Sequence, residues 1–486
     1  MKVAFGKVKL TPKDYIGRFL AGYTPVPRCT GKYDDIYARG VLIEDTTLDN
    51  IKKRFLVISM DFVQLPLLFT DYIKEKIQDT YRIHPNQVLI HATHTHKSLD
   101  MSSMFMKNPW GNGIFGVIWA IMFGTFRGDD RYKVWIAKRV VEMVGDMIRR
   151  LEPARIAWTK KTIEEDILLN RRHPTRRSKS QLCIMAFKHA TTNRTIGIIA
   201  SYGMHPTTLN MSIDKLSADY PGRFVHYFED ATGNKIDAVY ITGPAGDLNP
   251  ITTCGTDFEA LENYQNPVFF NTNPIYNQKG TYKDTKRLGK FLAEKALAIL
   301  ESIPDSSYFD TLDFKSYAKT FWVPMIDFTR YYSKSWLRNR FIHGLKRYLL
   351  LPMALAPADS HDPNFAGFAA KHRGLKRVVA YTQVSYVKFT ASRGKEKASF
   401  AIAGVPGELF EDFAKRFYAR TPEGANGLFI FQNANDWIAY LFPLDEYTMG
   451  GYEPFASFSP VCGTFVKNNF FTLLKEIDED LTGGYF

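Results

Sequence analysis

The chain has 486 residues, of which 45% are hydrophobic and 23% are charged. This composition is typical of a globular protein and excludes a disordered or collagen-like chain. The 63 basic residues outnumber the 50 acidic ones and give a formal net charge of +13. Such an excess indicates a polyanionic partner, and nucleic acid and an anionic membrane surface are the two candidates.

The predicted elements alternate between strands and helices. We expect strands over residues 55–62, 88–94, 196–202, 236–242, 399–405 and 428–432, and helices over residues 132–151, 284–302 and 408–420. This alternation favours an α/β fold. No internal repeat is evident, and at roughly 150 residues per domain the length allows one large catalytic domain or two to three smaller ones.

Two segments have unusual composition. Residues 111–126 are apolar but interrupted by glycines, and they are shorter than the roughly 20 residues that a membrane span needs. They fit a buried core element or an apolar loop that touches lipid. Residues 333–351 combine an apolar helical face with several cations, as in a basic interfacial helix. An ordinary surface helix with snorkelling cations would show the same pattern.

The four cysteines (Cys29, Cys183, Cys254 and Cys462) lie far apart in the chain. The absence of a CxxC pair excludes a zinc ribbon or a thioredoxin-type site, and we expect buried thiols. The first residues lack the apolar core and cleavage site of a signal peptide. We therefore expect a cytoplasmic or peripheral membrane-associated protein, with a secreted or periplasmic location as the alternative.

Three histidines follow one another closely in the segment Val-Leu-Ile-His-Ala-Thr-His-Thr-His over residues 88–96. In extended geometry His94 and His96 share one face, while His91 points to the other. An HxH pair commonly places two imidazoles at one metal or one reacting centre. An ordinary strand end with polar residues remains the alternative.

Four more polar residues or pairs follow apolar strands in tight turns. They are His205, Asp247 with Asn249, Glu408 at the expected start of a helix, and Tyr440. Each alone is better explained as a cap or turn residue. Together with the HxH pair they favour a site at the carboxyl ends of the strands, where ligands bind in open α/β sheets.

Two imidazoles and a carboxylate suit a catalytic zinc ion, which keeps an open position for a water of lowered pKa. The sequence therefore predicts a metal hydrolase. No Walker A motif or GxSxG elbow is evident, so nucleotide hydrolysis and serine-esterase chemistry lack a motif. Nucleic-acid binding is supported by net charge alone, and we expect no nucleic-acid partner.

Taken in order, the motifs of the chain resemble those of the neutral/alkaline (non-lysosomal) ceramidase family. The sharpest are Thr-His-Thr-His (93–96), Asn-Arg-Arg-His-Pro (170–174), His-Pro-Thr (205–207), Gly-Asp-Leu-Asn-Pro (246–250), Pro-Gly-Glu (406–408) and the stretch 435–453. The resemblance implies a zinc-dependent amidase that cleaves the N-acyl bond of ceramide into a fatty acid and a sphingoid base.

The resemblance also implies roles for individual residues. The zinc ligands that it implies are His94, His205, Glu408 and Tyr440. His96 and Arg171 would line the reacting centre, where His96 could protonate the leaving amine and Arg171 could stabilise the oxyanion. We count Asp247 and Asn249 among the catalytic candidates as well.

Two departures from the family pattern stand out. The family has Gly-Asp-Val-Ser-Pro, with a serine of assigned importance, where this chain has Asn249. A serine nucleophile is therefore impossible here, and we expect attack by zinc-activated water with a shifted substrate preference. The family has Ser-Gly-Pro after the HxH pair, where this chain has Lys97-Ser98-Leu99, and we expect this change to alter the pocket rim.

The resemblance implies one catalytic domain over residues 1–486, without the C-terminal immunoglobulin-like domain of the family. An apolar, lid-like insertion near residues 104–128 and the basic amphipathic segment near 333–351 would then contact an anionic membrane surface. The expected substrate is ceramide or a similar N-acyl lipid. The alternatives are a hydrolase of the same fold that acts on a different N-acyl lipid or ester, and a non-catalytic lipid-binding homologue.

Overall fold

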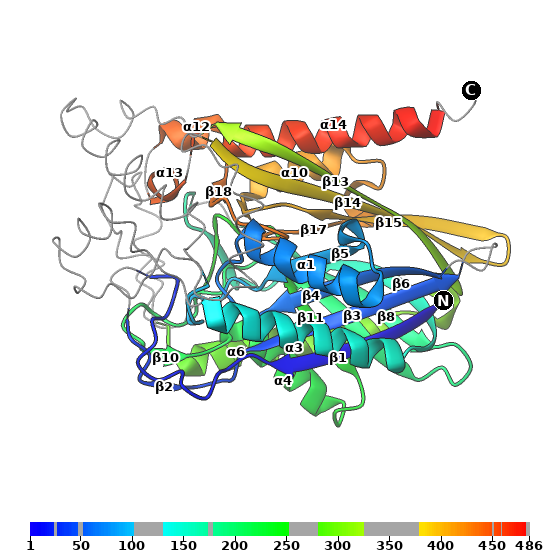
Figure 1. The fold of residues 1–486 in the computed structure, drawn as a ribbon, viewed down its shortest axis with the longest axis horizontal. Helices are drawn as coiled ribbons and strands as arrows, with labels where there is room; N and C mark the ends of the chain where they lie inside the picture. Colours follow the sequence, from blue (N-terminus) through cyan, green and yellow to red (C-terminus); the bar gives the residue numbers. More distant parts are fainter. Residues whose placement is uncertain are drawn as a thin grey trace.

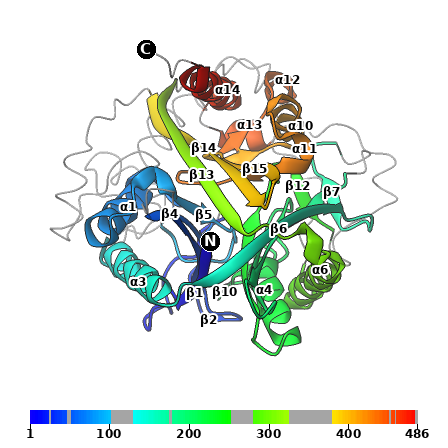
Figure 2. The same cartoon turned by 90° about the vertical axis from the view of Figure 1, so that its right-hand side faces the viewer.

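The computed structural model describes residues 1–23, 27–46, 52–101, 130–173, 178–251, 280–324, 379–449, 452–457 and 459–482. The fold is mixed α/β, as predicted, with two large sheets and helices packed on their outer faces (Figures 1 and 2). The expected segments at 104–128 and 333–351, and Cys254, lie outside the described residues. The other three cysteines are buried free thiols, as expected.

Three consecutive units of the chain share one order of elements, namely three strands, a helix, a fourth strand and a second helix. The first unit contains β1 (Lys2–Lys9), β3 (Tyr37–Thr46), β4 (Lys52–Met60), α1 (Leu67–Tyr81), β5 (Val88–Ala92) and α3 (Asp130–Arg149). The second contains β6 (Glu152–Thr162), β8 (Gln181–His189), β9 (Thr195–Tyr202), α4 (Asp219–Ala231), β11 (Asp237–Thr242) and α6 (Tyr282–Ser302). The third contains β13 (Thr311–Pro324), β14 (Val379–Arg393), β15 (Glu396–Gly404), α10 (Glu411–Arg420), β17 (Leu428–Phe431) and α14 (Cys462–Thr482).

Short elements lie in the connections. They are β2 (Gly31–Lys32), β7 (Leu168–Asn170), β10 (Lys215–Leu216), β12 (Leu248–Pro250), β16 (Glu408–Leu409), β18 (Tyr440–Leu441), α11 (Gly424–Gly427), α12 (Leu444–Thr448), α13 (Tyr452–Ala456) and the 3-10 turns η1 (Pro85–Gln87) and η3 (Asp305–Ser307).

Strand pairing is the same in each unit. The first three strands pair antiparallel, and the fourth pairs parallel to the third. A parallel pair requires a crossover connection, and α1, α4 and α10 supply one in each unit. The first two units form one eight-stranded sheet in the order β11-β9-β8-β6-β1-β3-β4-β5, and the third forms a four-stranded sheet, β13-β14-β15-β17.

One central core joins the three units. It contains apolar side chains from the inner faces of all three sets of strands, such as Phe5, Phe187 and Phe389, all nearly inaccessible to solvent. Each outer face is covered by the two helices of its own unit, and Figure 2 shows the three helix groups at three corners of the molecule. Because the third and fourth strands are covered on both faces, they read in sequence as continuous apolar runs.

The predicted strands and helices are all present with boundaries shifted by up to three residues, and two of these shifts lie near the site. The strand expected over 88–94 ends at Ala92, because His94 has a left-handed backbone with φ of 69°. The helix expected from Glu408 begins at Glu411, because Glu408 and Leu409 pair in parallel with Tyr440 and Leu441. Among the described helices, none combines the length and the apolar character that crossing a membrane would require.

The buried lysine of α1 gives a test of this packing. Lys74 is 2% exposed, and its ammonium lies 3.4 Å from the Gln383 side-chain oxygen of β14. Burial lowers the pKa of Lys74 to about 8. Below pH 8 the folded state therefore holds a buried charge, and this penalty disappears as the pH rises from 8 toward the usual lysine value of 10.5.

We expect Lys74→Met to stabilise the fold by up to roughly 3 kcal/mol at pH 7, with the gain vanishing above the unfolded-state pKa. Urea unfolding at pH 7 and at pH 10.5 measures the difference, with Lys76→Met on the same helix as the matched control. An equal effect of Lys74→Met at both pH values would contradict this account of the burial.

Candidate metal centre

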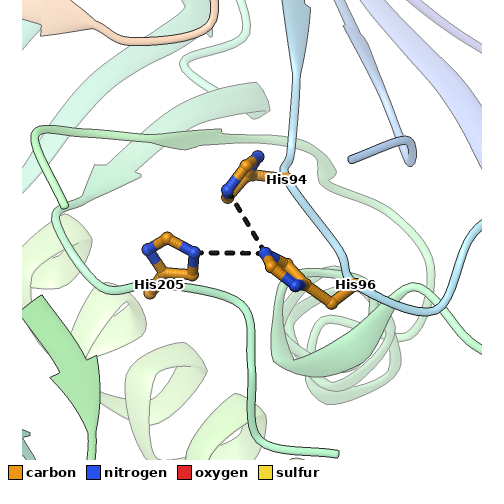
Figure 3. Close-up of side chains that lie close together, drawn as sticks. All are labelled: His94, His96 and His205. Atoms are coloured by element: carbon orange, nitrogen blue, oxygen red, sulfur yellow. Dashed lines mark hydrogen bonds between the residues drawn. The ribbon is translucent and has the colours of Figure 1, made fainter. Parts of the chain in front are cut away.

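The candidate site lies where strand ends of all three units meet. His94 and His96 follow β5, His205 follows β9, and Glu408 follows β15. In Figure 3 the three histidines come from two separate loops and point toward one another. All four side chains are buried, with at most 8% exposure. The predicted location at the carboxyl ends of the strands agrees with this arrangement.

The three imidazoles converge through their Nε2 atoms. The Nε2 of His96 lies 3.3 Å from that of His94 and 3.1 Å from that of His205, the two contacts drawn in Figure 3. The ligand atoms of the three residues all lie within 4.8 Å of one another, so this group could hold a metal ion.

Backbone carbonyls fix the tautomer of each imidazole. The Nδ1 atoms of His94, His96 and His205 lie 2.5, 2.8 and 3.0 Å from the carbonyl oxygens of Val63, Gly22 and Ala245. A carbonyl only accepts, so each Nδ1 carries a proton, and the neutral ring then presents a lone pair at Nε2. Metal-binding histidines are commonly held in this way, with the outer nitrogen donating to a carbonyl.

Burial keeps two of these rings uncharged. It lowers the pKa of His96 and of His205 well below the ordinary histidine value, and the neighbouring His94 lowers both further. The Nε2 lone pairs of His96 and His205 then face each other at 3.1 Å with no proton between them. That arrangement is repulsive by itself and is relieved by a cation at the centre.

Glu408 completes the donor set. Its Oε2 lies 3.1 Å from the Nε2 of His94 and 3.7 Å from that of His205. This oxygen is buried and accepts no hydrogen bond, whereas Oε1 accepts one from the indole of Trp437 at 2.9 Å. Imidazole nitrogens with one carboxylate oxygen are a donor set that zinc favours. The residues present therefore fit a divalent metal ion of that type.

Tyr440 lies beside Glu408 as its partner in the parallel pair β16–β18. Burial raises the pKa of Tyr440 well above the ordinary tyrosine value, and the Glu408 carboxylate adds to the rise. The Arg171 guanidinium lies over the Tyr440 ring, 5.4 Å from its centroid. Tyr440 is thus adjacent to the imidazole group and to a fixed positive charge.

Hydrogen bonds hold Arg171 in place on three sides. Its Nε donates to Glu453 at 2.6 Å, its Nη1 to the side-chain oxygen of Asn249 at 3.1 Å, and its Nη2 to the carbonyl of Gly246 at 2.8 Å. Burial opposes the charge, but Tyr440 and Glu453 together raise the pKa of Arg171 above its usual value. The guanidinium is therefore a permanent cation at the site.

Two other residues named from the sequence, Asp247 and Lys97, make their hydrogen bonds away from the imidazoles. The Asp247 carboxylate accepts hydrogen bonds from the Asn170 side chain at 2.8 Å and from the backbone N–H of Glu411 at 2.9 Å. It thus joins the loop of Arg171 to the start of α10, and burial raises the pKa of Asp247 to about 7. Lys97 does not lie at the rim as expected, because it is buried and donates to the carbonyls of Met211 and Ile213.

His91 faces away from the site, as predicted from strand alternation. Its Nδ1 contacts the Ser59 hydroxyl at 3.1 Å, and its Nε2 accepts from the backbone N–H of Thr242 at 3.1 Å. Both ring nitrogens therefore serve the packing of β4 and β5 on β11.

The structure also places residues to which the sequence assigned no individual role. Tyr452 packs edge to face on Tyr440 at 5.9 Å between ring centroids and is 59% exposed, so it connects the buried site with solvent. Gly22 lies behind His96 with φ of 115°, and a side chain there would come within 2.7 Å of the His96 backbone. Only the spacing of Tyr452 and Glu453 within a recognised motif could have pointed to them.

Gln432 connects two of the metal-ligand loops. Its side-chain oxygen accepts from the N–H of Ala245 at 3.0 Å and from the N–H of Leu409 at 3.2 Å. Ala245 holds His205 through its carbonyl, and Leu409 directly follows Glu408. The carboxamide of Gln432, which is fully buried, therefore sets the spacing between these two ligands.

We expect Gln432→Met to weaken metal binding by about 10- to 100-fold, as outer-shell substitutions commonly do. Titration of the metal-free protein against a chromophoric chelator measures the affinity. Gln383→Met, which removes the same group from β14, serves as the control and should bind metal like the wild type. An unchanged affinity in Gln432→Met would show that the spacing does not depend on this residue.

No protein-family model matches the chain, and no curated protein matches its sequence. Solved structures do match. A neutral ceramidase from Pseudomonas aeruginosa is 15% identical, with a TM-score of 0.65 over 97% of this chain and 73% of that one. A ceramidase complexed with C2 is also 15% identical, with a TM-score of 0.66 over 98% and 75% of the two chains. The predicted resemblance is thereby confirmed at the level of structure: along nearly its whole length, the chain has the fold of the neutral ceramidases.

Proposed function

We propose that the protein is a metal-dependent amidohydrolase that cleaves the N-acyl bond of ceramide or a ceramide-like lipid. The observation that carries the proposal is the convergence of three imidazole Nε2 atoms with the buried Oε2 of Glu408, which accepts no hydrogen bond. The ceramidase fold supports the substrate class, because both matched structures are ceramidases by name.

His94, His205, Glu408 and Tyr440 would hold the ion, and zinc suits these donors best. When bound, zinc supplies a Lewis acid that polarises an amide carbonyl and acidifies water. Ionisation of Tyr440 is unfavourable in the buried site without such a cation, since burial and Glu408 both raise the pKa of Tyr440. The phenol would therefore become a ligand only in the presence of the ion.

His96 would move the proton. Its Nε2 is unprotonated and faces the centre, so it can accept a proton from the attacking water and deliver it to the leaving amine. The contact between Nδ1 and the Gly22 carbonyl keeps the ring in that orientation through both transfers. A second role for His96, as a third imidazole ligand, is favoured by its 3.1 Å and 3.3 Å contacts with the other two rings.

Arg171 and Asn249 would bind the reacting amide. Three of the five N–H donors of Arg171 are engaged, one on each nitrogen, and they hold the guanidinium in place as a fixed charge that would stabilise the developing oxyanion. The oxygen of Asn249 accepts from Arg171, which leaves its NH₂ group to donate to a substrate carbonyl or hydroxyl. No nucleophilic side chain is needed at this position, in agreement with attack by water.

The alternatives differ in substrate or in activity. A hydrolase of another N-acyl lipid or ester would use the same residues. The presence of Asn249 where the family has a serine favours this alternative. A lipid-binding homologue without activity would bind no stoichiometric metal. We rank it lowest because the imidazoles, Glu408 and Arg171 are all in place.

Substitution of the histidines separates the two roles of His96. We expect His94→Ala to lose the metal, whereas His96→Ala should keep stoichiometric zinc and lose activity by about 10²- to 10⁴-fold, the usual size of a general acid–base contribution. Metal content of the purified variants, measured by mass spectrometry, is read beside amide hydrolysis. Loss of zinc from His96→Ala would instead make this residue a ligand.

Asn249→Ser tests the substrate preference. We expect it to change the ratio of kcat/KM between ceramide and other N-acyl lipids by about tenfold, the usual effect of one altered hydrogen bond to a buried group. Hydrolysis of a panel of N-acyl lipids by both proteins gives the ratio, with Asn249→Ala as the variant that has no side-chain donor. An identical ratio in all three proteins would remove Asn249 from substrate recognition.

A further inference from the structure

Exposed apolar side chains gather at one end of the molecule. Seven large apolar residues are exposed in the part of the chain that the structure describes. All seven lie at the end of the molecule where β5, β9 and β15 end and the candidate metal ligands follow them. The turns at the opposite end, as far as they are described, expose none. The distribution is one-sided, whereas single exposed apolar residues on an ordinary surface are scattered.

Two of these residues form an aromatic pair. Trp322 and Tyr381 are cross-strand partners near the tip of the β13–β14 ribbon, with ring centroids 4.8 Å apart and exposures of 44% and 36%. The tip projects beyond the end of β15, because Gly404 pairs with Ser385, four residues into β14 from Tyr381. In Figure 1 the arrowhead of β13 lies at the same end of the molecule as β2, β10 and α13.

The other exposed residues surround the same end. Ile16 lies in the loop after β1, Tyr33 lies between β2 and β3, and Met211 follows β9. Leu444 and Tyr452 lie in α12 and α13, and Tyr452 packs on Tyr440 of the candidate site. These exposed apolar residues, called the rim from here on, thus lie at the end of the molecule that carries the candidate site.

The segment that joins the two strands at the ribbon tip is basic in sequence. Pro324 and Val379 pair there, so the chain between them leaves and returns at the tip. Residues 325–378 contain ten basic and three acidic residues, a net charge of +7 out of the +13 of the whole chain. Lys13 and Arg28, on the loop that carries Ile16, are exposed cations at the same end.

Aromatic side chains with nearby cations suit one kind of partner. Trp and Tyr favour the boundary between lipid headgroups and acyl chains, and cations are attracted to anionic headgroups. We propose that this rim, which includes the Trp322–Tyr381 pair, docks on the surface of an anionic lipid bilayer. The inference rests on the proposed function, because docking would bring the end of the molecule that carries the site onto the surface that holds the substrate.

Vesicle sedimentation tests the docking without any chemistry. The full chain is mixed with phosphatidylcholine vesicles that contain or lack phosphatidylglycerol. We expect binding to the anionic vesicles, and we expect the double variant W322S/Y381S to bind about tenfold more weakly or worse, since two apolar side chains lose their burial. W322F/Y381F should retain binding, and Lys235→Ser at the opposite end should bind like the wild type.

Two results would overturn the proposal: wild-type binding by W322S/Y381S, or equal binding to vesicles with and without phosphatidylglycerol. Added salt gives a second reading, because the Debye length falls from about 10 Å at 0.1 M to about 3 Å at 1 M and binding should fall with it. Hydrolysis of a water-soluble short-chain N-acyl amide is measured in parallel. Failure of the proposed function abolishes this hydrolysis and leaves vesicle binding intact, whereas failure of the docking proposal does the reverse.

Discussion

The arrangement depends on one short stretch of backbone, residues 432–436 after β17, which ties the three units together at the site. Asn435 exchanges hydrogen bonds with Ile90 of β5, through its N–H at 2.6 Å and its side-chain oxygen at 3.0 Å. The carbonyl of Asn433 accepts from Ala92, two residues before His94, while Gln432 holds Ala245 and Leu409. A shift of this stretch would therefore move every candidate ligand loop at once, which explains why its polar side chains are buried.

The three units share an order of elements but contribute different chemistry. The residue after the third strand is Asp61 in the first unit, where it pairs with Arg39 at 2.9 Å and accepts from Tyr37. At the corresponding strand ends, the second unit provides His205 and the third provides Glu408. The first unit instead provides its two imidazoles after the fourth strand. A symmetric scaffold thus carries an asymmetric donor set, and the function lies in the strand-end residues and not in the shared topology.

The sequence predicted secondary structure well where the pattern depends on neighbouring residues. Apolar runs such as those of β9 and β11 are readable because both faces of these strands are buried. The distant partners were not readable. Arg171 and Glu453 are 282 positions apart, and Glu408 entered a two-residue strand because Tyr440 lies beside it in space. The left-handed backbone of His94 was also missed, since nothing in a histidine predicts a positive φ, and such strain persists where surrounding contacts impose it. The order common to the three units left no matching sequence pattern.

The electrostatic balance of the site links metal binding to the fold. The interior holds three imidazoles whose Nε2 atoms converge and a buried carboxylate oxygen without a hydrogen-bond partner. The guanidinium of Arg171 already forms an ion pair with Glu453. Arg171 alone therefore does not neutralise the Glu408 carboxylate as well. A bound divalent ion would satisfy the imidazoles and Glu408 together, and would favour the ionised form of Tyr440. Because the candidate ligands come from all three units, a bound ion would also hold those units together. The free energy of metal binding would then add to the free energy of unfolding.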